Sequence, residues 1–222
     1  MSTTDKSRLA YVNILTLVFV FLASGCSYIH AQLGETCNSR AHVQMILVDY
    51  LSRRFASHSP VRLAIIPFSV PANLSGYNTE RPGVGDQLAW KIHSEWLQNA
   101  AVPIVEVLNR QDWPGKKEEF FTGNHGAIAM AREAGYDLVQ VGLVENLRST
   151  DALTVHSKII EVESGITVWY ATSTVVTRRP ELQSAAAMTG LVNRVPALLY
   201  TPEMVDSAAV CLVKEATSEE IP

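Results

Sequence analysis

The residues with the clearest chemistry in this 222-residue chain are its three cysteines, Cys26, Cys37 and Cys211. A cysteine thiol can be acylated, oxidised to a disulfide or used to bind a metal. Cys26 stands shortly after an uncharged apolar run of ten residues, 14–23. That run is too short to cross a bilayer as a helix, which takes about 20 residues, and it has the length of the apolar part of a secretion signal.

The residues around Cys26 predict that its thiol is acylated. Lys6 and Arg8 give the chain a basic start, and three small residues come directly before the cysteine: Ala23, Ser24 and Gly25. The stretch resembles the bacterial lipoprotein signal, which implies that residues 1–25 are removed and that Cys26 becomes the lipidated N-terminus. Two or more acyl chains, at about 0.8 kcal/mol per buried CH₂, hold a protein stably on a membrane. Ser27 stands where aspartate would favour the inner membrane, so the resemblance implies the periplasmic face of the outer membrane.

The other two cysteines, Cys37 and Cys211, are candidates for a disulfide, because an oxidising compartment favours pairing of spare thiols. The bond would join the start of the domain to its last helix. It would close a loop of about 175 residues and contribute about 3–5 kcal/mol to stability. Two unpaired thiols, one of them buried in a helix, remain the alternative, since sequence does not give their distance.

Composition and motif spacing argue against several classes of function. Without residues 1–25 the chain carries 16 basic and 21 acidic residues and no basic stripe, so we expect no nucleic-acid partner. The six histidines show no i, i+4 pair and the chain has no Cys-x-x-Cys, so no metal site is expected. Gly83-x-Gly85 precedes a helix, but Leu88 replaces the third glycine of a dinucleotide fingerprint. We therefore expect no cofactor and no enzyme activity.

Hydrophobic periodicity predicts one α/β domain over residues 39–217, after a lipidated cysteine and short tether at 26–38 and before a tail at 218–222. A tether of this length keeps the domain near its membrane. We expect helices at 39–56 (capped by Asn38 or Ser39), 84–99, 124–135 (capped by Asn124), 180–195 and 201–217, with a short helical turn in 111–124. We expect strands at 61–70, 102–110, 136–149, 153–164 and 166–176. The last three have short connections, which favours an antiparallel meander inside a mixed β-sheet flanked by helices.

Five features of residues 61–177 resemble one superfamily of envelope domains. They are Pro67-Phe68 at the end of the first apolar strand, Asn109-Arg110 at the end of the second, Gly135-x-Asp137, Gly142, and the Ser164-Gly165 turn. The resemblance is to the domain of the TolB N-terminal region, the curli lipoprotein CsgG, the synthase activator LpoB and flagellar ring lipoproteins. It implies an anticodon-binding-domain-like sandwich with a non-enzymatic role in assembly or interaction, and it leaves a homo-oligomer open. The loops are too short for the membrane hairpins of a secretion pore.

Tryptophan is the residue type most typical of interface hot spots, and Trp90 lies off the apolar stripe of its predicted helix. That stripe consists of Val84, Leu88, Ile92 and Trp96. Trp90 is therefore a candidate anchor for a partner protein, unless another helix covers it. Three residues in loops are further candidates for the same surface: Trp113, Tyr77 and Arg81.

Three hypotheses of function follow. The first is a lipid-anchored periplasmic scaffold or assembly factor that docks onto an envelope protein complex. The second is an LpoB-like activator of a peptidoglycan synthase, which the short tether disfavours. The third is an enzyme or small-ligand binder with a cleft beside the 71–85 loop.

Overall fold

A computed structural model describes residues 36–55, 60–71, 83–108, 116–145, 152–176 and 202–218. The predicted signal peptide, Cys26 and the helix expected at 180–195 lie outside these residues. No helix in the described part of the chain is long and apolar enough to cross a membrane.

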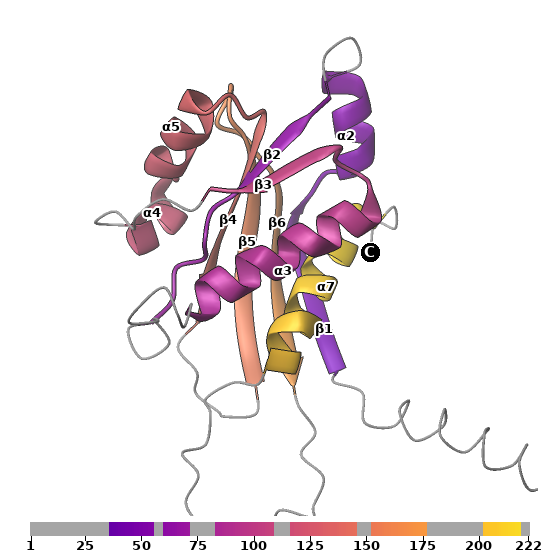
Figure 1. The fold of residues 1–222 in the computed structure, drawn as a ribbon, viewed down its shortest axis with the longest axis vertical. Coiled ribbons are helices and arrows are strands. Elements are labelled where there is room, and N and C mark those ends of the chain that lie inside the picture. The colour runs from indigo at the N-terminus through magenta and orange to yellow at the C-terminus, as the bar shows by residue number, and fades with distance from the viewer. Residues whose placement is uncertain are drawn as a thin grey trace, which may run out of the picture. The chain divides into compact units, whose positions relative to one another are not determined.

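The core of the domain is a mixed six-stranded sheet of order β1-β6-β5-β4-β2-β3 (Figure 1). Its strands are β1 (Thr36–Gln44), β2 (Arg62–Ile65), β3 (Ile104–Val107), β4 (Leu138–Val144), β5 (Ala152–Glu161) and β6 (Thr167–Val176). β2 pairs in parallel with β3 and β4, and every other pair is antiparallel. The structure confirms the predicted meander of three strands and the mixed sheet flanked by helices.

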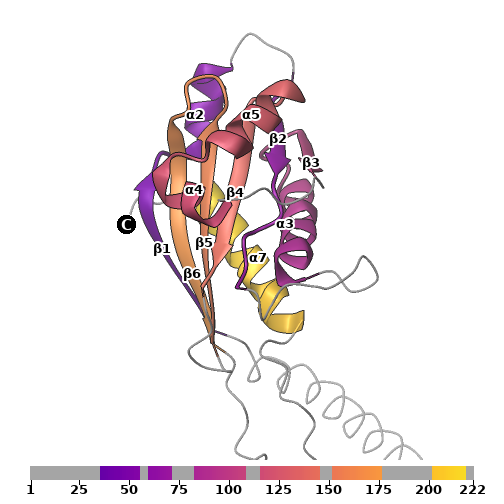
Figure 2. The same ribbon diagram turned by 90° about the vertical axis from the view of Figure 1, so that its left-hand side faces the viewer.

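Five described helices accompany the sheet: α2 (Leu47–Arg54), α3 (Val84–Asn99), α4 (Lys116–Thr122), α5 (His125–Glu133) and α7 (Pro202–Thr217). Figure 1 shows α3 and α7 side by side over the sheet, and Figure 2 shows the same pair from the side. The predicted helices at 84–99 and 201–217 are confirmed, and the helical turn expected in 111–124 is α4.

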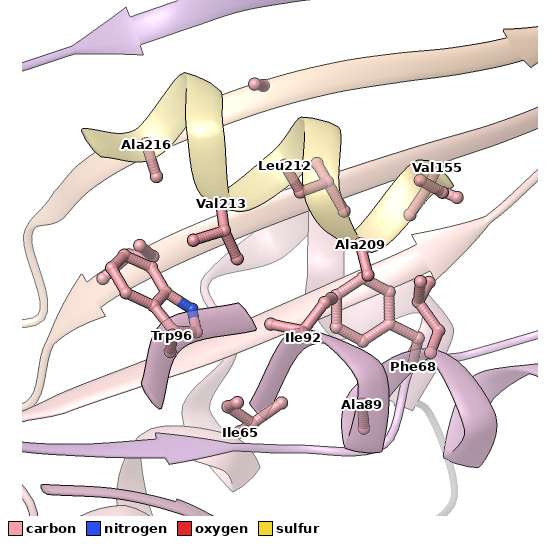
Figure 3. Packing of buried hydrophobic residues seen from close by; sticks show 14 of the residues in the cluster. Ile65, Phe68, Ala89, Ile92, Trp96, Val155, Ala209, Leu212, Val213 and Ala216 are labelled. Atoms are coloured by element: carbon pink, nitrogen blue, oxygen red, sulfur yellow. The ribbon is translucent and has the colours of Figure 1, made fainter. Parts of the chain in front are cut away.

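The two faces of the sheet belong to two separate apolar clusters. Along β2, Leu63 and Ile65 point into the larger cluster, whereas Ala64 and Ile66 point into the smaller one. This alternation follows from the period of two in a strand. The larger cluster lies under α3 and α7, where Ile92 and Trp96 meet Ala209 and Val213 (Figure 3). The smaller cluster lies under α4 and α5 and includes Phe120, Ala127 and Ala131.

The helix predicted at 39–56 is wrong in its first half. Residues 36–44 form β1, and α2 begins only at Leu47, with Ile46 and not Asn38 or Ser39 at its N-cap. Thr36 to Asn38, assigned to the tether, are therefore strand. The helical spacing from Leu47 onward is real, but the preceding residues pair with β6, which follows more than 120 residues later. Long-range pairing of this kind overrides local periodicity.

Asn124 is the N-cap residue of α5, as predicted, but its side chain does not cap the helix. Asn124 has a left-handed backbone (φ 56°), and its side chain makes no capping hydrogen bond. The Glu119 carboxylate of α4 accepts a hydrogen bond from the Gly126 amide instead, at 2.8 Å. An anionic side chain in this position also interacts favourably with the positive end of the helix.

Candidate interaction surface

Helix α3 carries the candidate site, and its inner face is the predicted apolar stripe. Val84, Leu88, Ile92 and Trp96 are fully buried against the sheet and α7. The helix begins after Gly83, which has an extended backbone, and ends at Ala100, which is left-handed. Asp86 lies in the first turn, where the helix dipole favours an acidic residue.

A buried chain of hydrogen bonds ties α3 to the sheet. The Trp96 indole Nε1 donates to Gln140 Oε1 of β4 at 2.8 Å. Gln140 Nε2 then donates to Ser157 Oγ of β5 at 2.9 Å. Buried polar groups are nearly always paired. These hydrogen bonds therefore fix how far α3 lies along the sheet and which of its faces is turned toward the strands.

The outer face of α3 carries two large apolar side chains. Trp90 and Leu97 are each 50% exposed. They are seven residues apart, which places them almost two turns apart on the same side of the helix. His93 lies between them, with its ring edge-on to Trp90 at a centroid distance of 5.6 Å. We call Trp90, His93 and Leu97 the α3 surface.

The neighbouring helix holds α3 in place without covering this surface. Lys91 Nζ lies 2.8 Å from Asp206 Oδ1 of α7, and Asn99 Nδ2 donates to Thr217 Oγ1 of α7 at 3.2 Å. Val210 of α7 is also exposed, at 46%. The prediction that Trp90 lies away from the buried stripe is therefore confirmed, whereas its role in binding a partner remains to be tested.

The other predicted partner-binding residues, Trp113, Tyr77 and Arg81, lie outside the described residues, as does most of the 71–85 loop. Whether they join the α3 surface therefore stays a prediction.

The structure brings Cys37 and Cys211 together. A disulfide joins β1 to α7, with the two Cα atoms 6.5 Å apart and 174 residues of sequence separation. Both residues are half-buried. Among the described residues, no three histidine, cysteine, aspartate or glutamate side chains form a metal site.

A polar cluster on the meander was missed by the sequence analysis. Thr172 Oγ1 of β6 lies 2.8 Å from His42 Nε2 of β1 and 2.9 Å from His156 Nδ1 of β5. His156 Nε2 lies 2.6 Å from Glu145 Oε1 just after β4. These contacts link side chains from three neighbouring strands and the end of a fourth. The signal available in the sequence was the alternation of polar residues along 154–158 and 170–174.

Lys158 lies beside this cluster in an unusual setting for a cation. Its Nζ donates to the Phe120 carbonyl at 2.6 Å and lies 4.3 Å from the centre of the Phe120 ring. Burial lowers the pKa of this ammonium group, because an apolar surrounding disfavours its charged form. The lysine thus fastens α4 to β5.

No protein-family model and no curated protein matches the chain. Several solved structures are similar to it in fold. The PelC dodecamer from Paraburkholderia phytofirmans is 14% identical, with a TM-score of 0.47 over 83% of this chain and 100% of that one. The LpoB C-terminal domain from Salmonella enterica is 11% identical, with a TM-score of 0.34 over 60% of this chain and 93% of that one. TolB from Acinetobacter baumannii is 11% identical, with a TM-score of 0.33 over 82% of this chain and 31% of that one.

LpoB and TolB, two of the proteins that the sequence resembles, are thus among the matched structures. At TM-scores below 0.5, these likenesses say nothing about the function of this chain.

Proposed function

We propose that this protein is a non-enzymatic lipoprotein of the bacterial outer membrane, anchored through Cys26, whose domain docks onto an envelope protein complex through the α3 surface. It would act there as a scaffold or assembly factor. The observation that carries the docking proposal is the exposure of Trp90 and Leu97 on a helix whose opposite face is fixed by buried contacts.

The chemistry of the α3 surface suits a protein partner. Trp90 offers a large apolar ring with one N–H donor, which is typical of residues that dominate binding energy. Its position on a well-packed helix lowers the entropy that a partner would have to remove on binding. The edge-on contact with His93 further restricts the indole ring.

The anchor is supported by the basic start, the apolar run and the small residues before Cys26. Mass spectrometry of the N-terminal tryptic peptide from the membrane fraction tests it. We expect a peptide that begins at Cys26 and carries acyl chains. A peptide that retains residues before Cys26, or an unmodified Cys26, would contradict the anchor.

The docking proposal is tested by quantitative affinity purification from cells that express the wild type or Trp90→Ala. We expect at least one envelope protein to be recovered about tenfold less with the variant, since loss of a hot-spot side chain costs about 2 kcal/mol or more. Lys117→Ala, which changes an exposed residue of α4, is the matched control and should recover the wild-type set. Equal recovery by all three proteins would contradict the proposal.

The same experiment separates the scaffold from the alternative function. A peptidoglycan synthase lost from the Trp90→Ala sample would favour an LpoB-like activator. Components of another envelope complex, or the protein itself, would favour the scaffold.

A further inference from the structure

Strand β1 is joined to the domain in a different way from the other strands. Each described side chain of β1 is at least partly exposed, whereas every other strand has buried residues. Its inward-facing side chains are small ones, Cys37, Ser39 and Ala41. Because burial of apolar surface is the main source of stability, packing contributes little to the attachment of this strand.

Polar contacts to a single neighbour make up most of the remaining attachment. β1 is the first strand in the sheet order and pairs only with β6. The register shifts between Ala41 and Val43, which interrupts the ladder. Ser39 hydrogen bonds to Ser173, and His42 to Thr172. Water can replace such contacts, and each contributes only about 0.5–1.5 kcal/mol net.

The disulfide supplies the covalent attachment. Cys37 is the second residue of β1, and Cys211 lies in α7, a helix held by fully buried Met204, Val205 and Leu212. The bond therefore connects an edge strand without a fully buried described side chain to a firmly packed helix. Both cysteines are half-buried, so neither residue is enclosed in the core.

We infer that the Cys37–Cys211 disulfide is a redox latch on β1: the closed bond keeps the strand on the sheet, and its reduction releases the strand while the rest of the domain stays folded. A dithiol reductant supplies the two electrons and two protons. It becomes a disulfide, and Cys37 and Cys211 become free thiols.

Release of β1 would change the reach of the domain. This consequence rests on the proposed anchor at Cys26. Release would free the ten residues 37–46, which precede α2. Fully extended, ten residues span at most about 35 Å. A reducing partner would therefore allow the domain to work farther from its membrane.

Arg40, in the middle of β1, provides a built-in test with trypsin. A peptide bond inside a paired strand resists the protease, and its cleavage follows the population of the open form. The full-length lipoprotein in detergent is digested with and without the dithiol reductant dithiothreitol. We expect cleavage after Arg40 to become at least about tenfold faster on reduction, while Lys158 in β5 and Arg132 in α5 stay uncut. Arg40→Gln must abolish the new fragment.

Two results would overturn the latch. Cleavage after Arg40 that does not respond to reduction would show that β1 holds without the disulfide. Cleavage at Lys158 and Arg132 together with Arg40 would show that the bond stabilises the whole domain and not one strand. The released N-terminal fragment carries an acyl mass only if Cys26 is lipidated. The digestion therefore tests the redox latch and the lipid anchor independently of each other.

Discussion

The ring of Phe68 lies directly on Gly142 of β4: a Cβ on this glycine would lie 2.0 Å from Phe68 Cε2. The backbone of Phe68 approaches Gly85 of α3 just as closely, with 2.1 Å between its carbonyl oxygen and a Cβ placed there. The Phe68 amide also donates to the Gly85 carbonyl at 3.2 Å. Phe68, three residues after the end of β2, therefore sets the position of both the first turn of α3 and the centre of the sheet.

Gly142→Ala should consequently destabilise the domain. The added methyl group would overlap an aromatic ring in a packed core, and we expect the free energy of unfolding to fall by about 1–3 kcal/mol. Urea denaturation followed by tryptophan fluorescence measures it. Phe68→Leu in the same chain should restore part of the loss, because it removes the atoms in conflict. If the losses in unfolding free energy from the two substitutions simply added, Phe68 and Gly142 would not be in contact.

The Trp96–Gln140–Ser157 chain predicts a second core effect. Gln140→Leu keeps the size of the side chain but leaves the buried Trp96 Nε1 without its acceptor. Such an unpaired group costs about 1–3 kcal/mol. We expect a lower urea midpoint with an unchanged slope. Gln98→Leu, which changes an exposed residue of α3, is the control and should leave the midpoint nearly unchanged.

Glu161 should make the domain sensitive to acid. Burial alone raises its pKa, but hydrogen bonds from Ser164 and Arg54, together with the Arg54 charge, lower the pKa below the usual value. A carboxylate with a depressed pKa stabilises the fold above its unfolded pKa of about 4.3, and this contribution is lost as the pH falls through the folded pKa. Arg54 extends from α2, so acid should weaken the attachment of this helix to the β5–β6 turn.

The measurement is thermal unfolding of the wild type and Glu161→Gln between pH 7 and pH 3. We expect the variant to be less stable at pH 7, by about 1–3 kcal/mol, and the difference to shrink toward pH 3. A difference that is constant across this range would show that the charge of Glu161 has no part in stability.

The two tryptophans of α3 should separate stability from binding. Trp96→Ala empties a fully buried site and should cost about 3–5 kcal/mol. Trp90→Ala changes a side chain on the outer face and should alter stability by no more than about 0.5 kcal/mol. Parallel urea titrations check both values. A large loss for Trp90→Ala would mean that the residue is structural, and its effect on partner recovery could no longer be interpreted as binding.

The parts of the fold with strong periodicity could be predicted from the sequence. The stripe of α3, including the outward position of Trp90, follows from a period of 3.6, and the meander follows from three strands with short connections. β1 gave no such signal, because none of its described side chains is fully buried and there is no apolar alternation to detect. Its partner β6 lies far along the chain, and only the fold brings the two together.

In the candidate site, too, features that depend on one element could be predicted and features that depend on several could not. The position of Trp90 off the buried stripe could be inferred because it depends on one helix, whereas its exposure also depends on which helices lie beside α3. The hydrogen bonds that share Thr172 between His42 and His156 could not, because they require the register of three strands. Asn124 illustrates a local rule that held only in part: the residue stands at the N-cap, but its side chain makes no capping hydrogen bond, and Glu119 accepts one from the Gly126 amide instead.

Site-specific photo-crosslinking in living cells tests the central claim most directly. A benzophenone amino acid replaces Trp90 in the full-length lipoprotein, and Lys117 carries the same probe in a control strain. We predict a discrete crosslinked product from position 90, with an envelope protein identified by mass spectrometry, and none of that product from position 117. No crosslink from position 90, or the same products from both positions, would contradict docking through the α3 surface.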